Sequence, residues 1–169
     1  MKANAYRRRW ADWLPSALDA LAKDPPDFAS VMPHMPQPDF GPMPFTPGPS
    51  GPLRVALLSS SGVYDRRAQA PYAASSLIGD ATHRFIERAA PSAELAFAHE
   101  HFDHTAAQAD LETVLPRAAL AASGAELSAH VVSWSGYLLD WPTFLEATIP
   151  QIVKRVLADG VNAALLVPI

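Results

Sequence analysis

The chain has 169 residues, 49% hydrophobic and 18% charged, a composition that predicts one modest soluble globular domain. A formal net charge of −4 and an isolated basic run, Arg7–Arg9, argue against a nucleic-acid partner. Cysteine is absent, which excludes a disulfide framework or thiolate metal site within these residues, and no apolar run approaches the roughly 20 residues of a membrane span, so we expect a cytoplasmic protein without a membrane partner.

The first 23 residues predict an amphipathic helix over about residues 5–23, because six apolar side chains recur at helical spacing. They are Trp10, Trp13, Leu14, Ala17, Leu18 and Leu21. Residues 24–52 follow, and eleven of the seventeen prolines lie between Met1 and Pro52. This density predicts an extended arm without helix or central strand. We expect the helix and the arm to dock on the remaining domain or on a neighbour in an oligomer.

From residue 53 onward, short apolar runs alternate with helical patterns. Strands are predicted at 53–59, 93–99, 130–134 and 161–167. Helices are predicted at 116–122, ended by Gly124, and at 149–157, ended by Gly160, with Thr148 and Gln151 as a capping box. The pattern predicts a three-layer, doubly wound α/β domain over 53–169 with a mainly parallel sheet. Because the last strand runs to the final residues, we expect that sheet to be incomplete at its C-terminal side.

Five blocks in this region occur in an order that resembles the selenoprotein B family of glycine, sarcosine, betaine and D-proline reductases. The resemblance covers roughly residues 53–169. The blocks are Val55–Ser59 with Gly62; Gly79–Asp80 with Arg84; His99, Asp103, Asp110 and Pro116; Ser135–Tyr137; and Leu157–Leu166. In that family a catalytic selenocysteine, or a cysteine in some members, directly follows the last of these strands. The resemblance therefore leads to the hypothesis that the stop after Ile169 is a selenocysteine codon and that the chain as given is inactive.

The resemblance implies reductive cleavage of a carbon–heteroatom bond in an amino-acid-like substrate. It makes His99 the candidate proton donor and Asp103 its orienting carboxylate. It implies no bound cofactor, a partner subunit of the pyruvoyl type, a dithiol reductant and an oligomeric assembly. The candidate substrate-binding residues are Gly62, Asp80, Arg84, Ser135 and Gly136.

Alternative interpretations of these residues remain open. The H-x-H-x-D-H run at 99–104 resembles the metal-binding signature of the metallo-β-lactamase superfamily, which implies a zinc or iron hydrolase. Its ligands would be His99, His101, Asp103 and His104. Asp80 and Arg84, four residues apart, also fit a solvated pair on a helix. A non-catalytic interaction subunit is the third possibility.

Overall fold

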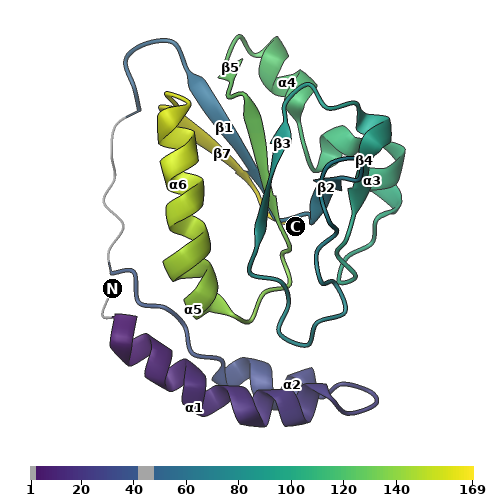
Figure 1. Cartoon of the computed structure of the whole chain (residues 1–169), viewed down its shortest axis with the longest axis vertical. Helices are drawn as coiled ribbons and strands as arrows, with labels where there is room; N and C mark the ends of the chain where they lie inside the picture. Colours follow the sequence, from purple (N-terminus) through teal and green to yellow (C-terminus); the bar gives the residue numbers. More distant parts are fainter. Residues whose placement is uncertain (1–2, 42–47) are drawn as a thin grey trace. The chain divides into compact units, whose positions relative to one another are not determined.

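The computed structural model describes residues 3–41 and 48–169 (Figure 1). The chain divides into two compact units, with the boundary between Pro47 and Gly48. The first unit contains α1 (Ala3–Leu21), which confirms the predicted helix, and two short turns, α2 (Phe28–Val31) and η1 (Met32–His34). Trp13, Ala17 and Leu21 of the predicted stripe are buried. The Trp13 Nε1–H donates to the Val31 carbonyl at 3.2 Å, which ties α1 to α2. The Pro-rich segment therefore contains short helical turns that its composition did not predict.

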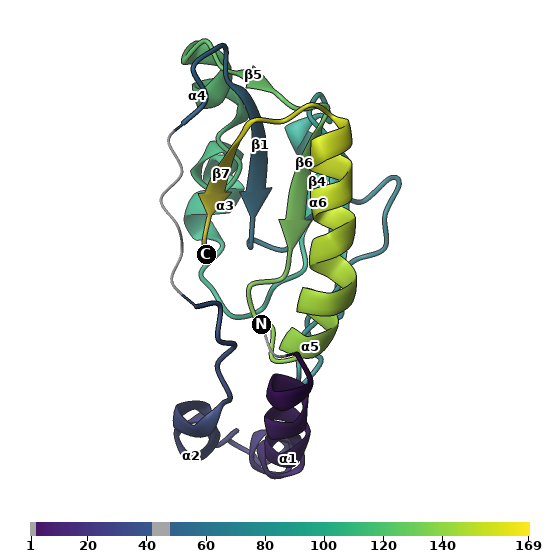
Figure 2. The same cartoon turned by 90° about the vertical axis from the view of Figure 1, so that its left-hand side faces the viewer.

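The second unit is built on a mainly parallel sheet flanked by helices, which confirms the predicted α/β class. The central strand β1 pairs in parallel with β7 on one edge and with β5 and β6 on the other, and β3 pairs antiparallel with β6. Figure 2 shows β7, β1 and β6 side by side with their arrowheads at the same end. The strands are β1 (Arg54–Ser59), β3 (His83–Glu87), β5 (Glu126–Leu127), β6 (His130–Trp134) and β7 (Ala163–Val167).

The strand predicted at 93–99 is shorter than expected and lies outside the parallel sheet. Only β4 (Leu95–Phe97) forms, because Pro91 and the turn η2 (Ser92–Glu94) precede it. It pairs antiparallel with β2 (Val63–Asp65) in a separate two-stranded sheet. The chain then continues through α3 (Thr105–Ala109), η3 (Leu111–Thr113) and α4 (Arg117–Ala122), which confirms the predicted helix before Gly124.

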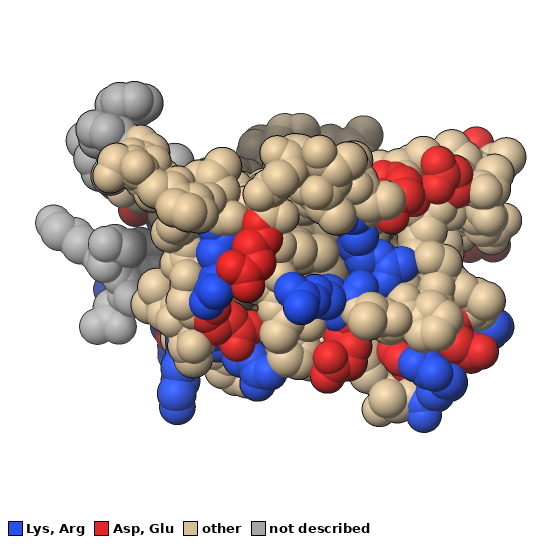
Figure 3. All heavy atoms as spheres, turned by 90° about the horizontal axis from the view of Figure 1, so that it is seen from above, with Lys and Arg blue, Asp and Glu red and all other residues tan. Residues whose placement is uncertain are grey.

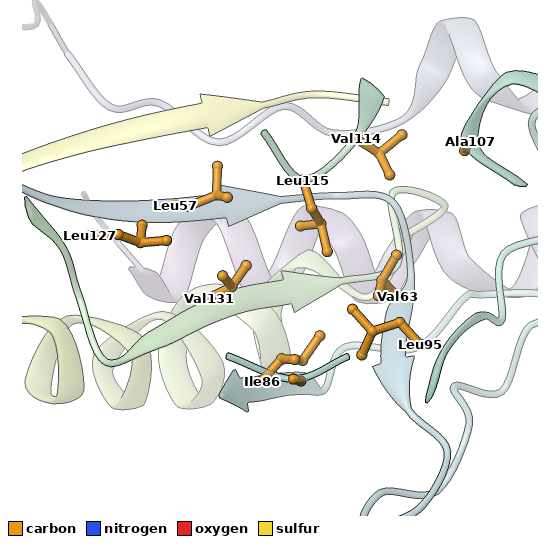
Figure 4. Packing of buried hydrophobic residues seen from close by; sticks show 10 residues of the cluster. Leu57, Val63, Ile86, Leu95, Ala107, Val114, Leu115, Leu127 and Val131 are labelled. Carbon is orange, nitrogen blue, oxygen red and sulfur yellow. The ribbon is translucent and has the colours of Figure 1, made fainter. Parts of the chain in front are cut away.

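Alternation along the central strands directs side chains to the two faces of the sheet. Leu57 and Val131 point to one face, where they pack in a cluster closed by the segment from α3 to α4 (Figure 4). Trp134 is turned to the other face, where its ring lies 5.9 Å from that of Phe144. The other buried members of the cluster are Val63, Ile86, Ala90, Leu95, Ala107, Val114, Leu115 and Leu127.

The last helix begins earlier than predicted, and the predicted capping box is wrong. α5 (Trp141–Thr143), the π-helical turn η4 (Phe144–Thr148) and α6 (Ile149–Ala158) follow one another without a break. Thr148 therefore has helical backbone angles, and its hydroxyl donates to the Ala81 carbonyl at 2.5 Å. Gln151 donates to the Ala147 carbonyl instead of reaching back to a cap.

The two ends of this helix are fixed by residues with clear local roles. The Asp140 carboxylate accepts from the Thr143 N–H at 3.2 Å and is the N-cap. At the other end Gly160 has φ +70, its N–H donates to the Leu157 carbonyl, and the Val161 N–H donates to the Val156 carbonyl. These two bonds form a Schellman motif, which confirms Gly160 as the residue that ends the helix.

Replacing Asp140 with alanine is expected to lower the free energy of unfolding by about 1 kcal/mol, because the first turn loses its side-chain acceptor. Asp140→Asn is the matched control, since its amide oxygen can still accept from the Thr143 N–H. Urea unfolding followed by circular dichroism measures both. Equal losses in the two variants would show that charge, not capping, is what matters at this position.

Two observations bear on the predictions that the chain has no membrane and no nucleic-acid partner. Among the described helices, none has both the length and the apolar character that crossing a bilayer requires. On the face seen in Figure 3, acidic and basic side chains are interspersed. That face therefore offers no broad basic patch to a nucleic acid.

Candidate functional site

The carboxyl ends of β1, β6 and β7 meet at one edge of the sheet, which is where parallel α/β sheets bind ligands. The backbone N–H of Ser60, just after β1, donates to the Val167 carbonyl at 3.2 Å. Its hydroxyl accepts from the Ile169 N–H at 2.8 Å. On the other side Ser61 forms an isolated bridge with Ser135, just after β6. Segments from three parts of the chain are thus held together here.

His99 lies at this junction and is only 4% exposed. Its Nδ1 faces the His101 N–H and its Nε2 faces the Tyr137 N–H, each at 3.1 Å. Burial, with the neighbouring His101 and His104 imidazoles adding to it, lowers the pKa of His99 to about 4. The ring is therefore neutral at pH 7, which counts against its predicted role as a proton donor and makes it an anchor for the loops around it.

The two ring nitrogens of His99 both lie within hydrogen-bond distance of backbone N–H groups. A neutral imidazole has one N–H group and one nitrogen that accepts. Both nitrogens of His99 face backbone N–H groups, so the ring can accept from only one of them at a time.

Three glycines allow the loops to approach one another at the junction. A Cβ on Gly62, which has φ +69, would lie 2.8 Å from the Cβ of His99. A Cβ on Gly136 would lie 2.9 Å from both the His99 Nε2 and the Ile169 carbonyl oxygen. A Cβ on Gly79, which has φ +77, would lie 2.1 Å from the Tyr137 carbonyl oxygen. A side chain at any of these positions would force the backbone or the ring to move.

Of the predicted site residues, Gly62, His99, Ser135 and Gly136 come together at the junction. Ser135 is buried, and its hydroxyl lies 3.4 Å from the Tyr137 carbonyl oxygen. Ser60 and Tyr137 were not predicted as site residues, although Tyr137 adjoins Gly136 and Ser60 lies two residues before Gly62. What revealed them is their contact with β7 and with His99, which only the folded chain displays.

Asp103 and the two other histidines of the H-x-H-x-D-H run have separate partners. Asp103 accepts from the N–H and the hydroxyl of Thr105 at the start of α3, and these bonds lower the pKa of its carboxyl. The His104 Nε2 lies 2.5 Å from the His99 carbonyl oxygen, and the ring of exposed His101 stacks on Tyr137 at 3.9 Å. The described residues contain no group of three or more His, Cys, Asp or Glu side chains placed to hold a metal ion. The metal alternative gains no support from this geometry.

Asp80 and Arg84 hold a loop together and do not lie on a helix. Arg84 is in β3, its Nε donates to the Ala70 carbonyl at 3.0 Å, and its guanidinium lies 4.2 Å from the Tyr72 ring centroid. Asp80 accepts from the Ala73 N–H at 2.8 Å. Burial opposes its ionisation, but hydrogen bonds from Thr82 and Ala73 outweigh this and lower the pKa of its carboxyl. Both charged groups are thus engaged within the segment 70–84, and neither is directed at the junction as a substrate anchor.

Buried serines give the strand ends a polar interior. The Ser59 hydroxyl donates to that of Ser61 at 2.9 Å. The neighbouring Ser133 hydroxyl is fully buried and has no hydrogen-bond partner within the described part of the chain. Small polar side chains therefore replace the apolar ones of the core as β1 and β6 reach the junction.

Comparison with protein-family models, curated proteins and solved structures finds no match to this chain. What bears on its function is therefore the geometry of the strand ends and the identity of the sequence blocks that meet there.

Proposed function

We propose that this chain is a selenoprotein B-like subunit of a cytoplasmic reductase that cleaves a carbon–nitrogen or related bond in an amino-acid-like substrate. A selenolate or thiolate supplied directly after β7 would be its nucleophile. A partner subunit of the pyruvoyl type and a dithiol would complete the reaction, and the assembly would be oligomeric.

One observation carries the proposal: the sequence blocks that resemble this family contact one another at the junction. Gly62 of the first block packs on His99 of the third, and Gly79 of the second packs on Tyr137 of the fourth. Gly136 of the fourth block separates His99 from Ile169, which follows the last strand. Blocks that are distant in sequence thus meet beside Ile169, which supports the proposal.

The chemistry balances with a dithiol as the reductant. The selenolate or thiolate attacks the substrate carbon, and a carbon–selenium or carbon–sulfur bond forms as the carbon–nitrogen bond breaks. The electron pair of that bond leaves on nitrogen, which takes a proton and departs as an amine. One thiolate of the dithiol then attacks the selenium or sulfur, and the carbon–selenium or carbon–sulfur bond breaks with its electron pair going to carbon, which takes a proton to form a new C–H bond. The second thiol displaces the selenolate or thiolate from the mixed intermediate, and the dithiol leaves as a disulfide. The chain contributes a buried, polar setting around the neutral His99 ring, which would help to orient the substrate.

The test compares the chain ending at Ile169 with the same chain extended by one cysteine or selenocysteine. Each is incubated with dithiothreitol, the partner subunit and glycine, sarcosine, betaine or D-proline. We expect carbon–nitrogen cleavage and dithiol oxidation from the extended forms alone, faster with selenocysteine, because no residue of the 169 can replace the nucleophile. Cleavage is measured as released amine or, for cyclic D-proline, as the ring-opened amino acid.

The Ser123→Cys variant is the matched control, because it offers a thiol on an exposed residue after α4, away from the junction. Activity of the chain ending at Ile169 would place the chemistry elsewhere. Inactivity of both extended forms with all four amines would count against an amine reductase.

A further inference from the structure

The backbone that leaves β7 is held by a side chain where the sheet can no longer hold it. The register of β1 and β7 ends at Ser59 opposite Val167, and the next residue, Pro168, has no N–H to donate. The following N–H, that of Ile169, is bound by the Ser60 hydroxyl at 2.8 Å. Ser60 thus extends the attachment between the two strands by two residues, using its hydroxyl in place of a backbone group.

The backbone of Gly136 lies close to the Ile169 peptide, and the absence of a side chain on Gly136 allows this approach. Its φ is not positive, so an alanine could adopt its backbone conformation. The space is what forbids a side chain, since a Cβ would lie 2.9 Å from the Ile169 carbonyl oxygen and 3.0 Å from that of Ser60. The His99 Nε2 is equally close to the same point, at 2.9 Å. The Ile169 peptide is therefore confined between the Ser60 side chain and the backbone of Gly136, beside the His99 ring.

Ser60 and Ile169 differ in their exposure to solvent. Ser60 is 7% exposed, whereas Ile169 is 41% exposed. The hydrogen bond is thus sheltered while the residue that it holds reaches solvent. A sheltered hydrogen bond favours one backbone direction over others severalfold.

We propose that Ser60 and Gly136 are positioning residues that fix the direction in which the chain leaves β7. They present the residue after Ile169 to the substrate in one geometry, next to the His99 ring. This inference rests on the proposed function, which places the nucleophile at that position. Neither residue touches the reacting atoms, and both act through the peptide of Ile169.

The experiment uses the full chain with one cysteine directly after Ile169 as a chemical probe. The rate of thiol alkylation by iodoacetamide, measured from pH 6 to 10, gives the reactivity and the apparent pKa of that thiol. Ser60→Val removes the hydroxyl, and Ser60→Thr keeps it at the same volume, so a packing cost that both share cancels in the comparison. Gly136→Ala tests the space, and Ser123→Ala is a serine control after α4, at the far end of the sheet.

In the Ser60→Val and Gly136→Ala variants, we expect the alkylation rate at pH 7 to move about three- to tenfold towards that of an unstructured cysteine peptide, as loss of one hydrogen bond implies. Ser60→Thr and Ser123→Ala should retain the parent value. With a substrate that is turned over, Ser60→Val should lower kcat and leave KM unchanged. Circular dichroism verifies that each variant is folded.

The outcomes separate this inference from the proposed function. Folded Ser60→Val and Gly136→Ala variants whose thiols keep the parent pKa and rate would overturn the inference. A parent thiol that already reacts like the unstructured peptide would also overturn it. A thiol that responds to both substitutions in a protein that turns over none of the four amines would support the positioning role and refute the reductase.

Discussion

Replacing Gly79 with alanine is expected to lower the free energy of unfolding by about 3 kcal/mol, in two parts. At φ +77 the new side chain strains the backbone. Its Cβ would also lie 2.1 Å from the Tyr137 carbonyl oxygen and 3.0 Å from the Leu138 Cα. These are backbone atoms, so no side-chain rotation relieves the overlap, and the segment after β6 must move.

The Gly124→Ala variant separates the two parts of this cost. Gly124 has φ +81 and nothing within 4 Å of its ideal Cβ, so alanine there brings only the conformational strain of about 1 kcal/mol. Urea unfolding of both variants gives the difference. A similar loss of stability in the two would mean that Gly79 and Tyr137 are not in close contact, and the junction as described would be incorrect.

Stability is expected to fall by about 2–3 kcal/mol between pH 6.5 and pH 4 because of His99 alone. Its pKa is lowered to about 4 in the folded protein, from an ordinary value of 6.5, by burial and by the neighbouring imidazoles. Between these two values the unfolded chain binds a proton that the folded chain does not. Acidification therefore favours unfolding through this window, and the contribution of His99 is complete below about pH 4.

His99→Gln is the variant that isolates this contribution, because a glutamine amide does not titrate and its oxygen can still accept from the Tyr137 N–H. Burial and the nearby Arg84 also lower the pKa of His83, so other groups titrate in the same range. They affect both proteins equally. Urea unfolding at half-unit pH intervals should give a shallower decline for the variant, and parallel curves would show that His99 is not held neutral.

The sequence predicted the strands that are short, nearly continuous apolar runs. The predicted runs at 53–59, 130–134 and 161–167 match β1, β6 and β7 within two residues. β1 and β6 are mostly buried, as central parallel strands require, whereas β7 is an apolar run with three exposed residues at the edge of the described sheet. β3 was missed. It is an antiparallel strand whose residues His83, Arg84 and Glu87 are polar or charged, so its sequence contains no apolar run that would predict a strand. The tertiary pairing with β6 decides its conformation.

The sequence could predict the site residues that follow parallel strands, because strand topology determines their position. It could not predict the partners of residues whose position depends on contacts between loops. Parallel strands bring their carboxyl ends together, so residues after β1, β6 and β7 had to meet. The spacing of Asp80 and Arg84 suggested a helix or a cleft, whereas both groups bind the loop that precedes β3. Spacing along the chain cannot reveal which backbone groups a loop will present to a charged side chain.

The position of β7 at the edge of the described sheet affects how easily this strand opens locally. In the described part of the chain β7 pairs with β1 alone, so alternate amides of this strand face away from the sheet. Strand β1 is covered on both edges. Local opening of β7 should therefore require less free energy than opening of β1, and its amide hydrogens should exchange with solvent deuterium sooner. Of the three strands that end at the candidate site, β7 should therefore open most readily, whereas β1 and β6 are each paired on both edges.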